Sequence, residues 1–322
     1  MRAIRISEAG GPEQLKLENI AVPEPGPGQA VVRIAAAGVN FIDVYQRSGL
    51  YKVPLPYTMG MEGAGTVESI GDGVDAIRPA DRVCYASVPG SYAEYAVVPV
   101  TSLVPVPSGL DLKLGAASML QGMTAHYLTH STYSLKPGDT CLVHAAAGGV
   151  GGLIVQMAKM LGARVFGTTS TAEKADHAKK AGCDEVILYN EKDFDVEARR
   201  LTDGRGVDVV YDSVGKSTWD KSLNALRPLG MMVTFGNASG AVGNIDPLVL
   251  SQKGSLFLTR PTLASYISDP DQLRWRAGDV LRWITEGNLK IHIGGTYSLE
   301  QAGQAHRDLE SRNTRGKLLL TP

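Results

Sequence analysis

The pattern of apolar and polar residues differs between two parts of the 322-residue chain. From Met1 to about Pro107, short apolar runs alternate with turn residues, and residues 30–37 and 63–70 have the composition of strands. This part of the chain predicts a β-rich barrel or sandwich.

Between Ser108 and about Lys253, short apolar strands alternate with helical stretches. The pattern predicts strands over 140–144, 163–168, 185–188, 207–212 and 231–235, and helices over 150–161 and 172–181. Strand, helix and strand in this order indicate βαβ units and a parallel sheet. After Arg260 we expect a polar helix over 269–286, an amphipathic stretch around 299–309 and a terminal strand over 316–320. The simplest interpretation is an α/β domain inserted into a domain made from both ends of the chain.

The charge balance narrows the functional classes. With 32 Lys and Arg against 33 Asp and Glu, the chain lacks the basic excess of a nonspecific nucleic-acid binder or of a protein that adheres to an anionic membrane. The N-terminal segment lacks the apolar core of a secretory signal. Cys84, Cys141 and Cys183 are too widely spaced for a disulfide framework or a zinc-type motif, which fits a reducing compartment. We therefore expect a cytoplasmic protein.

The most specific motif runs from His144 to Gly151, between an apolar strand and a helix. A pyrophosphate needs backbone N–H donors and a helix N-terminus at close range, so glycines that keep side chains out of its path favour binding. Against the G-x-G-x-x-G form, Ala146 holds the first position, while Gly148 and Gly151 hold the second and third. A tight turn in any doubly wound protein is the alternative, but the flanking strand, helix and second βα unit favour a dinucleotide. The residues expected to contact it here are Ala147, Gly148, Gly149, Val150 and Gly151.

The end of the next strand indicates which dinucleotide binds. An acid that holds a ribose 2′-hydroxyl is expected about 20 residues further on, but that position is Thr168, and no carboxylate ends the strand. The loop instead offers the hydroxyls of residues 169–171 and then Lys174, and Tyr189 closes the following strand. Hydroxyls with a cation suit a 2′-phosphate, so Ser170, Lys174 and Tyr189 favour NADPH over NADH. Taken singly, Lys174 is equally a solvated lysine and Tyr189 a half-buried strand end.

The segment from Gly138 to Lys159 resembles the quinone oxidoreductase signature of the medium-chain dehydrogenase/reductase superfamily. Residues 40–51 are similar to the first active-site segment of the group that includes zeta-crystallin. Residues 212–215, 235–240 and 255–261 resemble later segments of the bacterial enzymes. The resemblance spans the chain and implies an α/β protein. In it, a GroES-like β-rich catalytic domain, residues 1–122 and 262–322, surrounds a Rossmann cofactor domain with a doubly wound parallel sheet, residues 123–261.

The same resemblance raises the question of metal. Zinc alcohol dehydrogenases of the superfamily place a Cys ligand in the segment matching residues 40–43 and a His-Glu pair at Met61-Glu62. Here Asn40 and Met61 stand at the ligand positions, and the four-cysteine structural lobe is absent. The histidines that we interpret as surface or satisfied residues are His126, His130, His144 and His177. Since zinc needs about four N, S or O ligands, we expect a metal-free enzyme.

Without a Lewis acid, oxidation of an alcohol is difficult, whereas quinones and enones accept a hydride directly. The resemblance implies that Asn40, Tyr45 and Tyr51 line the acceptor pocket. The two tyrosines can stack on a flat ring and donate an O–H, or they simply cover a loop. Asn40 would hydrogen-bond the acceptor or the cofactor, and Asp43 would support the segment. The resemblance also implies cofactor contacts by Thr124, Phe235, Arg260 and Lys317. Thr124 would lie at the start of the helix that enters the cofactor domain, and Arg260 and Lys317 would supply positive charge. Lys317 is equally a solvated strand-edge lysine.

The function that follows is NADPH-dependent reduction of a quinone. An enoyl or alkenal reductase, with Tyr51 or water as proton donor, is the alternative within the enzyme class. A crystallin or RNA-binding relative that holds NADPH as a ligand is the alternative outside it, and the charge disfavours RNA. The apolar strand over 255–259 should lie at a sheet edge, where antiparallel pairing with its copy favours a homodimer, unless the terminal helices cover that edge in a monomer.

Overall fold

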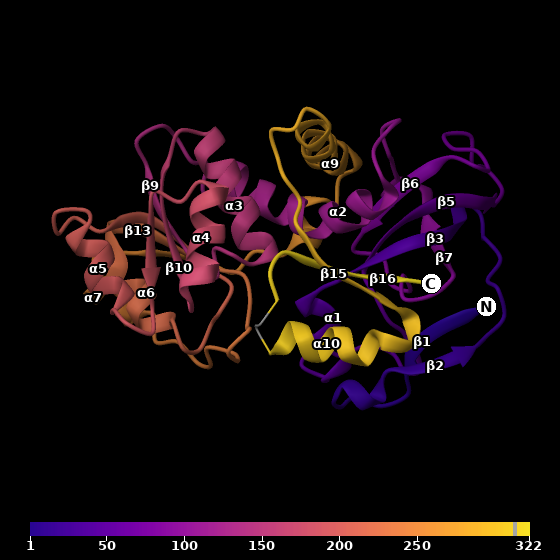
Figure 1. The fold of residues 1–322 in the computed structure, drawn as a ribbon, viewed down its shortest axis with the longest axis horizontal. Helices are drawn as coiled ribbons and strands as arrows, with labels where there is room; N and C mark the ends of the chain where they lie inside the picture. The colour runs from indigo at the N-terminus through magenta and orange to yellow at the C-terminus, as the bar shows by residue number, and fades with distance from the viewer. Residues whose placement is uncertain (312–313) are drawn as a thin grey trace. The chain divides into compact units, whose positions relative to one another are not determined.

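The computed structural model describes residues 1–311 and 314–322, and internal contacts divide the chain into two compact units. Unit 1 comprises residues 1–123 and 266–322, and unit 2 comprises residues 124–265. Each unit has its own sheet and its own apolar core (Figure 1). Among the described residues, no helix is both long and apolar enough to cross a membrane.

Unit 1 is built on a sheet in the order β15-β16-β3-β5-β6-β8, with β7 paired to β3. These strands are β3 (Gln29–Val39), β5 (Glu62–Ile70), β6 (Arg82–Ala86), β7 (Tyr95–Pro99), β8 (Val104–Pro105), β15 (Ile293–Ser298) and β16 (Lys317–Thr321). A smaller sheet joins β1 (Arg2–Ile6), β2 (Lys16–Asn19) and β4 (Tyr57–Thr58). The predicted strands over 30–37 and 63–70 lie within β3 and β5. The terminal strand is confirmed as β16, whose antiparallel pairing with β3 brings both parts of unit 1 into one sheet.

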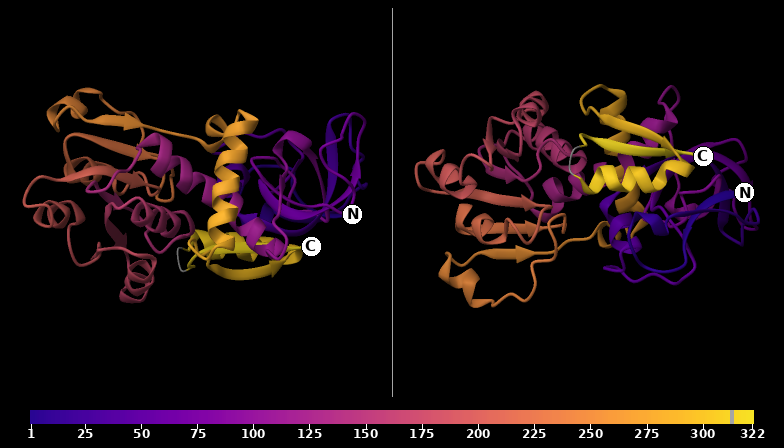
Figure 2. Two further views of the ribbon diagram at one scale, coloured as in Figure 1. Left: turned by 90° about the horizontal axis from the view of Figure 1, so that it is seen from above. Right: turned by 60° about the horizontal axis from the view of Figure 1, so that its bottom comes forward.

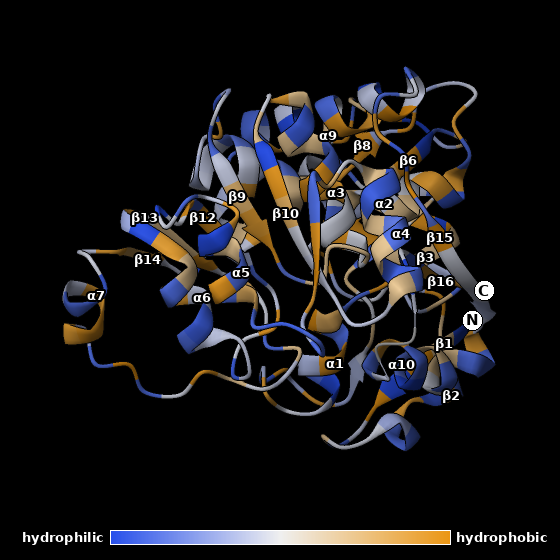
Figure 3. Cartoon of the chain, turned by 60° about the vertical axis from the view of Figure 1, so that its left-hand side comes forward, coloured by the Kyte–Doolittle hydropathy of each residue, from blue (hydrophilic) through white to orange (hydrophobic). Residues whose placement is uncertain are grey.

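The helices of unit 1 flank this sheet and supply part of its core. They are α1 (Phe41–Arg47), α9 (Pro270–Thr285), α10 (Ala302–Glu310) and most of α2 (Leu112–Tyr127), with α8 (Leu263–Tyr266) at the boundary. Val32 and Ile34 of β3 share one apolar cluster with Leu299 and Ala305, since the amphipathic stretch around 299–309 turns its apolar side to the sheet. Figure 3 shows the resulting alternation of apolar and polar residues along α10.

Unit 2 is a parallel sheet in the order β11-β10-β9-β12-β13-β14. Its strands are β9 (Thr140–Val143), β10 (Arg164–Thr169), β11 (Glu185–Leu188), β12 (Val207–Asp212), β13 (Leu226–Thr234) and β14 (Phe257–Thr259). Its helices are α3 (Gly149–Met160), α4 (Ala172–Ala181), α5 (Phe194–Arg200), α6 (Trp219–Ala225) and α7 (Leu248–Gln252). Figure 1 shows α3 and α4 on one face of the sheet and α5 and α6 on the other. The predicted doubly wound sheet is therefore confirmed.

The strands of unit 2 are apolar along most of their length because helices cover both faces. Val143, Phe166 and Val210 are fully buried, and Figure 3 shows the apolar colour concentrated on β9 and β10. The predicted edge strand lies last in the sheet as β14, and Figure 2 shows it with α7, in orange, along one margin of unit 2. Because all strands are parallel, their carboxyl ends meet at one edge, called here the carboxyl edge, where doubly wound proteins bind ligands.

Candidate functional site

The turn between β9 and α3 has the geometry of a phosphate-binding turn. Ala145 adopts a left-handed conformation with φ 51°, and Gly148 N–H donates to its carbonyl oxygen at 2.8 Å. Gly148 is the extended N-cap of α3, so the helix begins at Gly149. The first N–H groups of a helix have no partner within it and lie at the positive end of its dipole. The turn thus presents donors that suit an anion.

The glycines of this turn do not all serve the same purpose. A Cβ atom at Gly151 would lie 2.3 Å from the carbonyl oxygen of Ala145, whereas one at Gly148 would lie 3.1 Å from it. From the sequence we expected Gly148, Gly149 and Gly151 all to keep side chains out of the path of the cofactor. For Gly151 the structure gives a different reason, because α3 packs against the backbone of its own preceding turn.

Ser170 and Tyr189 directly follow β10 and β11, and Lys174 lies in the first turn of α4. The two strands pair in parallel, and Tyr189 N–H donates to the carbonyl oxygen of Thr169 at 3.2 Å. Thr169 is buried, and Thr171 Oγ1 accepts from Lys174 N–H at 3.3 Å as the N-cap of α4. Three hydroxyls were predicted to bind a 2′-phosphate. Thr169 is buried and Thr171 caps α4, whereas Ser170 is neither buried nor a helix cap.

Phe235 and Arg260 follow β13 and β14 at the same carboxyl edge. Phe235 N–H donates to the carbonyl oxygen of Asp212 at 2.8 Å. Arg260 Nη1 donates to Thr234 Oγ1 at 3.1 Å and to the carbonyl oxygen of Gly236 at 3.0 Å, which fixes the loop after β13. Unit 2 therefore gathers the predicted phosphate turn, the 2′-phosphate loop, Phe235 and Arg260 along one edge.

The predicted acceptor segment lies in unit 1, on and after α1. Tyr45 is buried and Tyr51 is 40% exposed, and their rings meet edge to face with centroids 5.2 Å apart. Tyr51 N–H donates to the carbonyl oxygen of Tyr45 at 2.9 Å. The segment therefore presents mainly the ring of Tyr51, with Tyr45 packed behind it.

Asn40 is held in a buried cluster of charged side chains. Its Nδ2 donates to Glu62 Oε2 at 2.9 Å and to the carbonyl oxygen of Gly38 at 3.2 Å, while its Oδ1 accepts from Lys317 Nζ at 2.6 Å. Lys317 is 1% exposed and pairs with Glu62 Oε2 at 2.5 Å. The alternative of a solvated strand-edge lysine is wrong, because β16 lies inside the sheet between β15 and β3.

Glu62 is a residue that the sequence analysis did not assign to the site. It is fully buried, and its Oε1 accepts from Leu120 N–H at 2.6 Å. A Cβ atom at Gly38 would lie 2.1 Å from Glu62 Oε2, so a glycine is required there. The available signal was a lone glutamate opening a strand of small residues, Gly63-Ala64-Gly65.

Asp43 supports the segment that begins at Asn40, as predicted. Its Oδ2 accepts from Asn40 N–H and from Tyr92 Oη–H, each at 2.8 Å. Burial raises the pKa of Asp43 to about 7. Tyr92 Oη also lies 3.2 Å from His306 Nε2, and His306 Nδ1 lies 3.1 Å from Arg47 Nη1. Burial, with the adjacent Arg47, lowers the pKa of His306 to about 3.

Two placements of the sequence analysis need correction. Thr124 was placed at the start of a helix, but it lies in the last turn of α2, which begins at Leu112. His126 and His130, which we interpreted one by one as surface or satisfied residues, lie together with their rings stacked and their centroids 4.3 Å apart. Across residues 1–311 and 314–322, no group of three or more His, Cys, Asp and Glu side chains could hold a metal ion.

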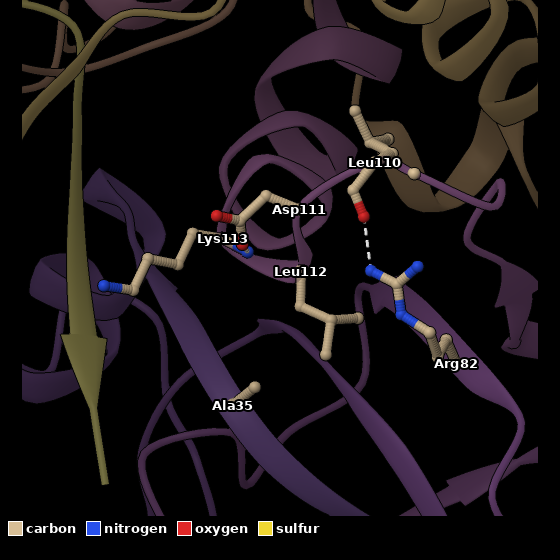
Figure 4. Close-up of a pocket in the computed structure, with 7 residues that line it drawn as sticks. Ala35, Arg82, Leu110, Asp111, Leu112 and Lys113 are labelled. Carbon is tan, nitrogen blue, oxygen red and sulfur yellow. Dashed lines mark hydrogen bonds between the residues drawn. The ribbon is translucent and has the colours of Figure 1, made fainter.

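A hollow lies in unit 1 at the beginning of α2, between Ala35, Arg82 and Lys113 (Figure 4). The guanidinium of Arg82 donates to the carbonyl oxygen of Leu110, so this cation is engaged within the protein. None of the residues predicted for the acceptor or cofactor site lines the hollow. We therefore do not assign the function to it.

The sequence matches two protein families. Residues 26–108 match the alcohol dehydrogenase GroES-like domain, and residues 149–274 match the zinc-binding dehydrogenase family. A quinone oxidoreductase of Pseudomonas aeruginosa is 45% identical over 100% of this chain and 99% of its own. A 2-haloacrylate reductase of a Burkholderia species is 43% identical over 98% of both chains. The crystal structure of Escherichia coli quinone oxidoreductase complexed with NADPH has a TM-score of 0.98 and 42% identity over 100% of both chains.

A GroES-like domain joined to a doubly wound nucleotide-binding unit defines a medium-chain dehydrogenase/reductase. Within that class, the chain matches several quinone oxidoreductases over nearly its full length. The chain belongs to the zeta-crystallin-like quinone oxidoreductase family.

Proposed function

We propose that this protein is an NADPH-dependent quinone reductase that transfers a hydride from NADPH to a quinone-type acceptor without a metal. The observation that carries the proposal is the carboxyl edge of unit 2, where the N-terminus of α3 follows β9 and the residues Ser170, Lys174 and Tyr189 follow the adjacent strands β10 and β11. The domain limits at residues 122/123 and 261/262 and the cytoplasmic location remain predictions.

The chain offers contacts to each part of the cofactor. The turn at residues 147–151 would hold the pyrophosphate at the N-terminus of α3, and Ser170, Lys174 and Tyr189 the 2′-phosphate. Phe235 and Arg260 lie on the same edge, and Thr124 and Lys317 remain predicted contacts. When bound, NADPH supplies the hydride.

The residues of unit 1 would orient the acceptor. Tyr51 is exposed enough to stack on a flat ring and to donate its O–H to an acceptor oxygen. Glu62 and Lys317 hold Asn40 on both sides of its amide. Reduction of a quinone to a hydroquinone takes one hydride and one proton, and Tyr51 or water would deliver that proton to the second oxygen.

A steady-state screen of NADPH oxidation tests the proposal. Benzoquinones and naphthoquinones should be reduced faster than enals or enoyl thioesters, and NADPH should be preferred to NADH. Tyr51→Phe, which keeps the ring but removes the hydroxyl, separates stacking from hydrogen bonding. If no quinone is reduced, the proposed reaction is wrong.

A reductase of α,β-unsaturated carbonyl compounds is the second candidate. The observation that favours it is the 43% identity to a 2-haloacrylate reductase. Including 2-chloroacrylate in the same screen distinguishes the two, because turnover of that acid with no quinone turnover would select this candidate.

We further propose an isologous homodimer through antiparallel pairing of β14. Phe257 of this edge strand is 56% exposed, and Leu248 of α7 and Leu229 of β13 are 56% and 59% exposed. Sedimentation should show a dimer at micromolar concentration, and Phe257→Asp should yield monomers. A native protein that sediments as a monomer contradicts the proposal.

A further inference from the structure

His144 occupies a buried position that the proposed reaction does not use. It follows the last residue of β9, immediately precedes the phosphate turn, and is 1% exposed. Its ring nitrogens lie 2.8 Å from Thr168 Oγ1 and 2.9 Å from Ser222 Oγ. Ser222 Oγ in turn lies 2.9 Å from Asp212 Oδ2. Side chains from β10, α6 and the ends of β9 and β12 thus form one continuous chain of hydrogen bonds.

The direction of each hydrogen bond in this chain is fixed. A carboxylate only accepts, so Ser222 donates its single hydrogen to Asp212 and must accept one from His144 Nε2–H. Burial lowers the pKa of His144, which keeps the ring neutral. Nδ1 therefore accepts from the Thr168 hydroxyl. Each hydrogen in the chain is used once, which restricts the orientation of all four side chains.

Asp212 extends this chain to the loop after β12. Its Oδ1 accepts from the N–H groups of Val214 and Gly215 at 2.7 and 2.9 Å. Its Oδ2 accepts from Thr218 Oγ1 at 2.7 Å. At the other end of the chain, Thr168 lies two residues before Ser170. Three loops of the carboxyl edge are therefore tied to one buried imidazole.

We propose that His144 is a positioning residue for the dinucleotide. It holds the turn at residues 145–148 and the loops at 169–171 and 213–218 in the arrangement that accepts the cofactor. The inference rests on the proposed binding of NADPH. This chain of hydrogen bonds supports the pyrophosphate turn as well as the 2′-phosphate loop. Its loss should therefore weaken the binding of NADPH and of NADH alike. Loss of Lys174 should instead weaken NADPH alone.

The decisive variant is His144→Phe, which keeps an aromatic ring and its edge contact to Phe194, 4.7 Å between centroids, but removes both hydrogen bonds. In titrations that follow cofactor fluorescence, the Kd for NADPH and for NADH should each rise roughly tenfold. KM for NADPH should rise while kcat at saturation changes little. His144→Gln carries one donor and one acceptor, so it should recover much of the lost affinity.

The matched control is Asp208→Asn, at the amino end of the same sheet. Asp208 is also buried, and its Oδ2 accepts from Thr140 N–H at 2.8 Å. It therefore links β12 to β9 by a buried hydrogen bond, as His144 links β9 to β10 and α6. This variant should leave both Kd values unchanged. An equal rise in Kd for Asp208→Asn and His144→Phe would overturn the inference.

Hydrogen exchange of the protein without cofactor provides a second readout. In His144→Phe, amides of residues 145–149 and 213–218 should exchange faster than in the wild type, and in Asp208→Asn they should not. Unchanged exchange in both loops would also overturn the inference. If the wild type fails to bind NADPH, the proposed function is wrong, while the exchange comparison still decides the role of His144.

Discussion

Replacement of Asp43 by Asn should make the protein more stable at pH 8 than the wild type. Asp43 is fully buried, and burial raises its pKa from 3.8 to about 7. Its Oδ1 has no hydrogen-bond partner among the described residues, and neither has Gln46 Oε1, one helical turn further along α1. An Asn amide can accept through Oδ1 the two hydrogen bonds that Oδ2 now accepts, and it places an N–H donor where the unpartnered oxygen lies.

The magnitude follows from the pKa. The rise of the Asp43 pKa from 3.8 to about 7, at ~1.4 kcal/mol for each tenfold change in proton affinity, corresponds to about 4 kcal/mol of folding free energy. Because the folded state binds this proton more tightly, the contribution is fully present below pH 3.8 and is lost as the pH rises through about 7. His306 contributes to the pH dependence of stability with the opposite sign, because its pKa falls from 6.5 to about 3. Its contribution to stability is present above pH 6.5 and is lost on acidification. In the wild type the two slopes oppose each other between about pH 4 and pH 6.5.

Urea unfolding of the wild type and Asp43→Asn from pH 4 to pH 8 measures the difference. The variant should gain up to about 4 kcal/mol at pH 8 and little at pH 4, and its own stability should rise with pH as His306 loses its proton in the unfolded state. Asp208→Asn is the control and should lower the stability at pH 8. Hydrogen bonds from Arg205 and Arg227 outweigh burial at Asp208 and lower its pKa to about 2, so the wild-type carboxylate stabilises the fold. Equal gains for Asp43→Asn at pH 4 and pH 8, or a loss of stability at pH 8, would refute the reasoning.

Three further predictions concern the cofactor and metal. Lys174→Ala should weaken NADPH binding by roughly 1.5–3 kcal/mol, the scale of a charge-assisted hydrogen bond, and leave NADH nearly unchanged in titrations; equal affinity of the native protein for both cofactors would contradict this. Gly149→Val places a branched side chain in the first turn of α3, so NADPH binding should fall steeply while the thermal midpoint is retained, and normal binding would mean that the phosphate site lies elsewhere. Treatment with a chelator should leave activity intact, and elemental analysis that finds about one zinc per chain, lost together with activity, would reverse the metal-free prediction.

The parts of the site that could be predicted from sequence are those set by local pattern. Apolar runs that alternate with helical stretches predicted the parallel sheet, and parallel strands bring their carboxyl ends together whatever the loops contain. Gly148, Ser170 and Tyr189 therefore fell on one edge without knowledge of any contact. Their positions follow from strand order alone.

The buried charges of unit 1 could not be predicted in this way. Lys317 meets Asn40 across 277 positions and Glu62 across 255, and no local pattern reports such a pairing. The start of α2 was missed for a related reason. Gly122, next to the expected domain limit at 122/123, lies within the helix, and a Cβ atom there would approach Val280 Cγ1 of α9 to 2.7 Å. Its need for glycine comes from a distant helix and not from a turn.

The pairing of β16 with β3 has a consequence for synthesis on the ribosome. Unit 2 is contiguous and can complete its sheet as it emerges, whereas β3 must wait for a strand made more than 250 residues later. During that interval the end of β3 at residues 37–39, beyond the part that pairs with β7, is open to other chains, and the Glu62 carboxylate lacks its ammonium partner. Unit 2 can therefore mature first, and the arrival of Lys317 with β16 completes the pairing of β3 and supplies the ion pair to Glu62.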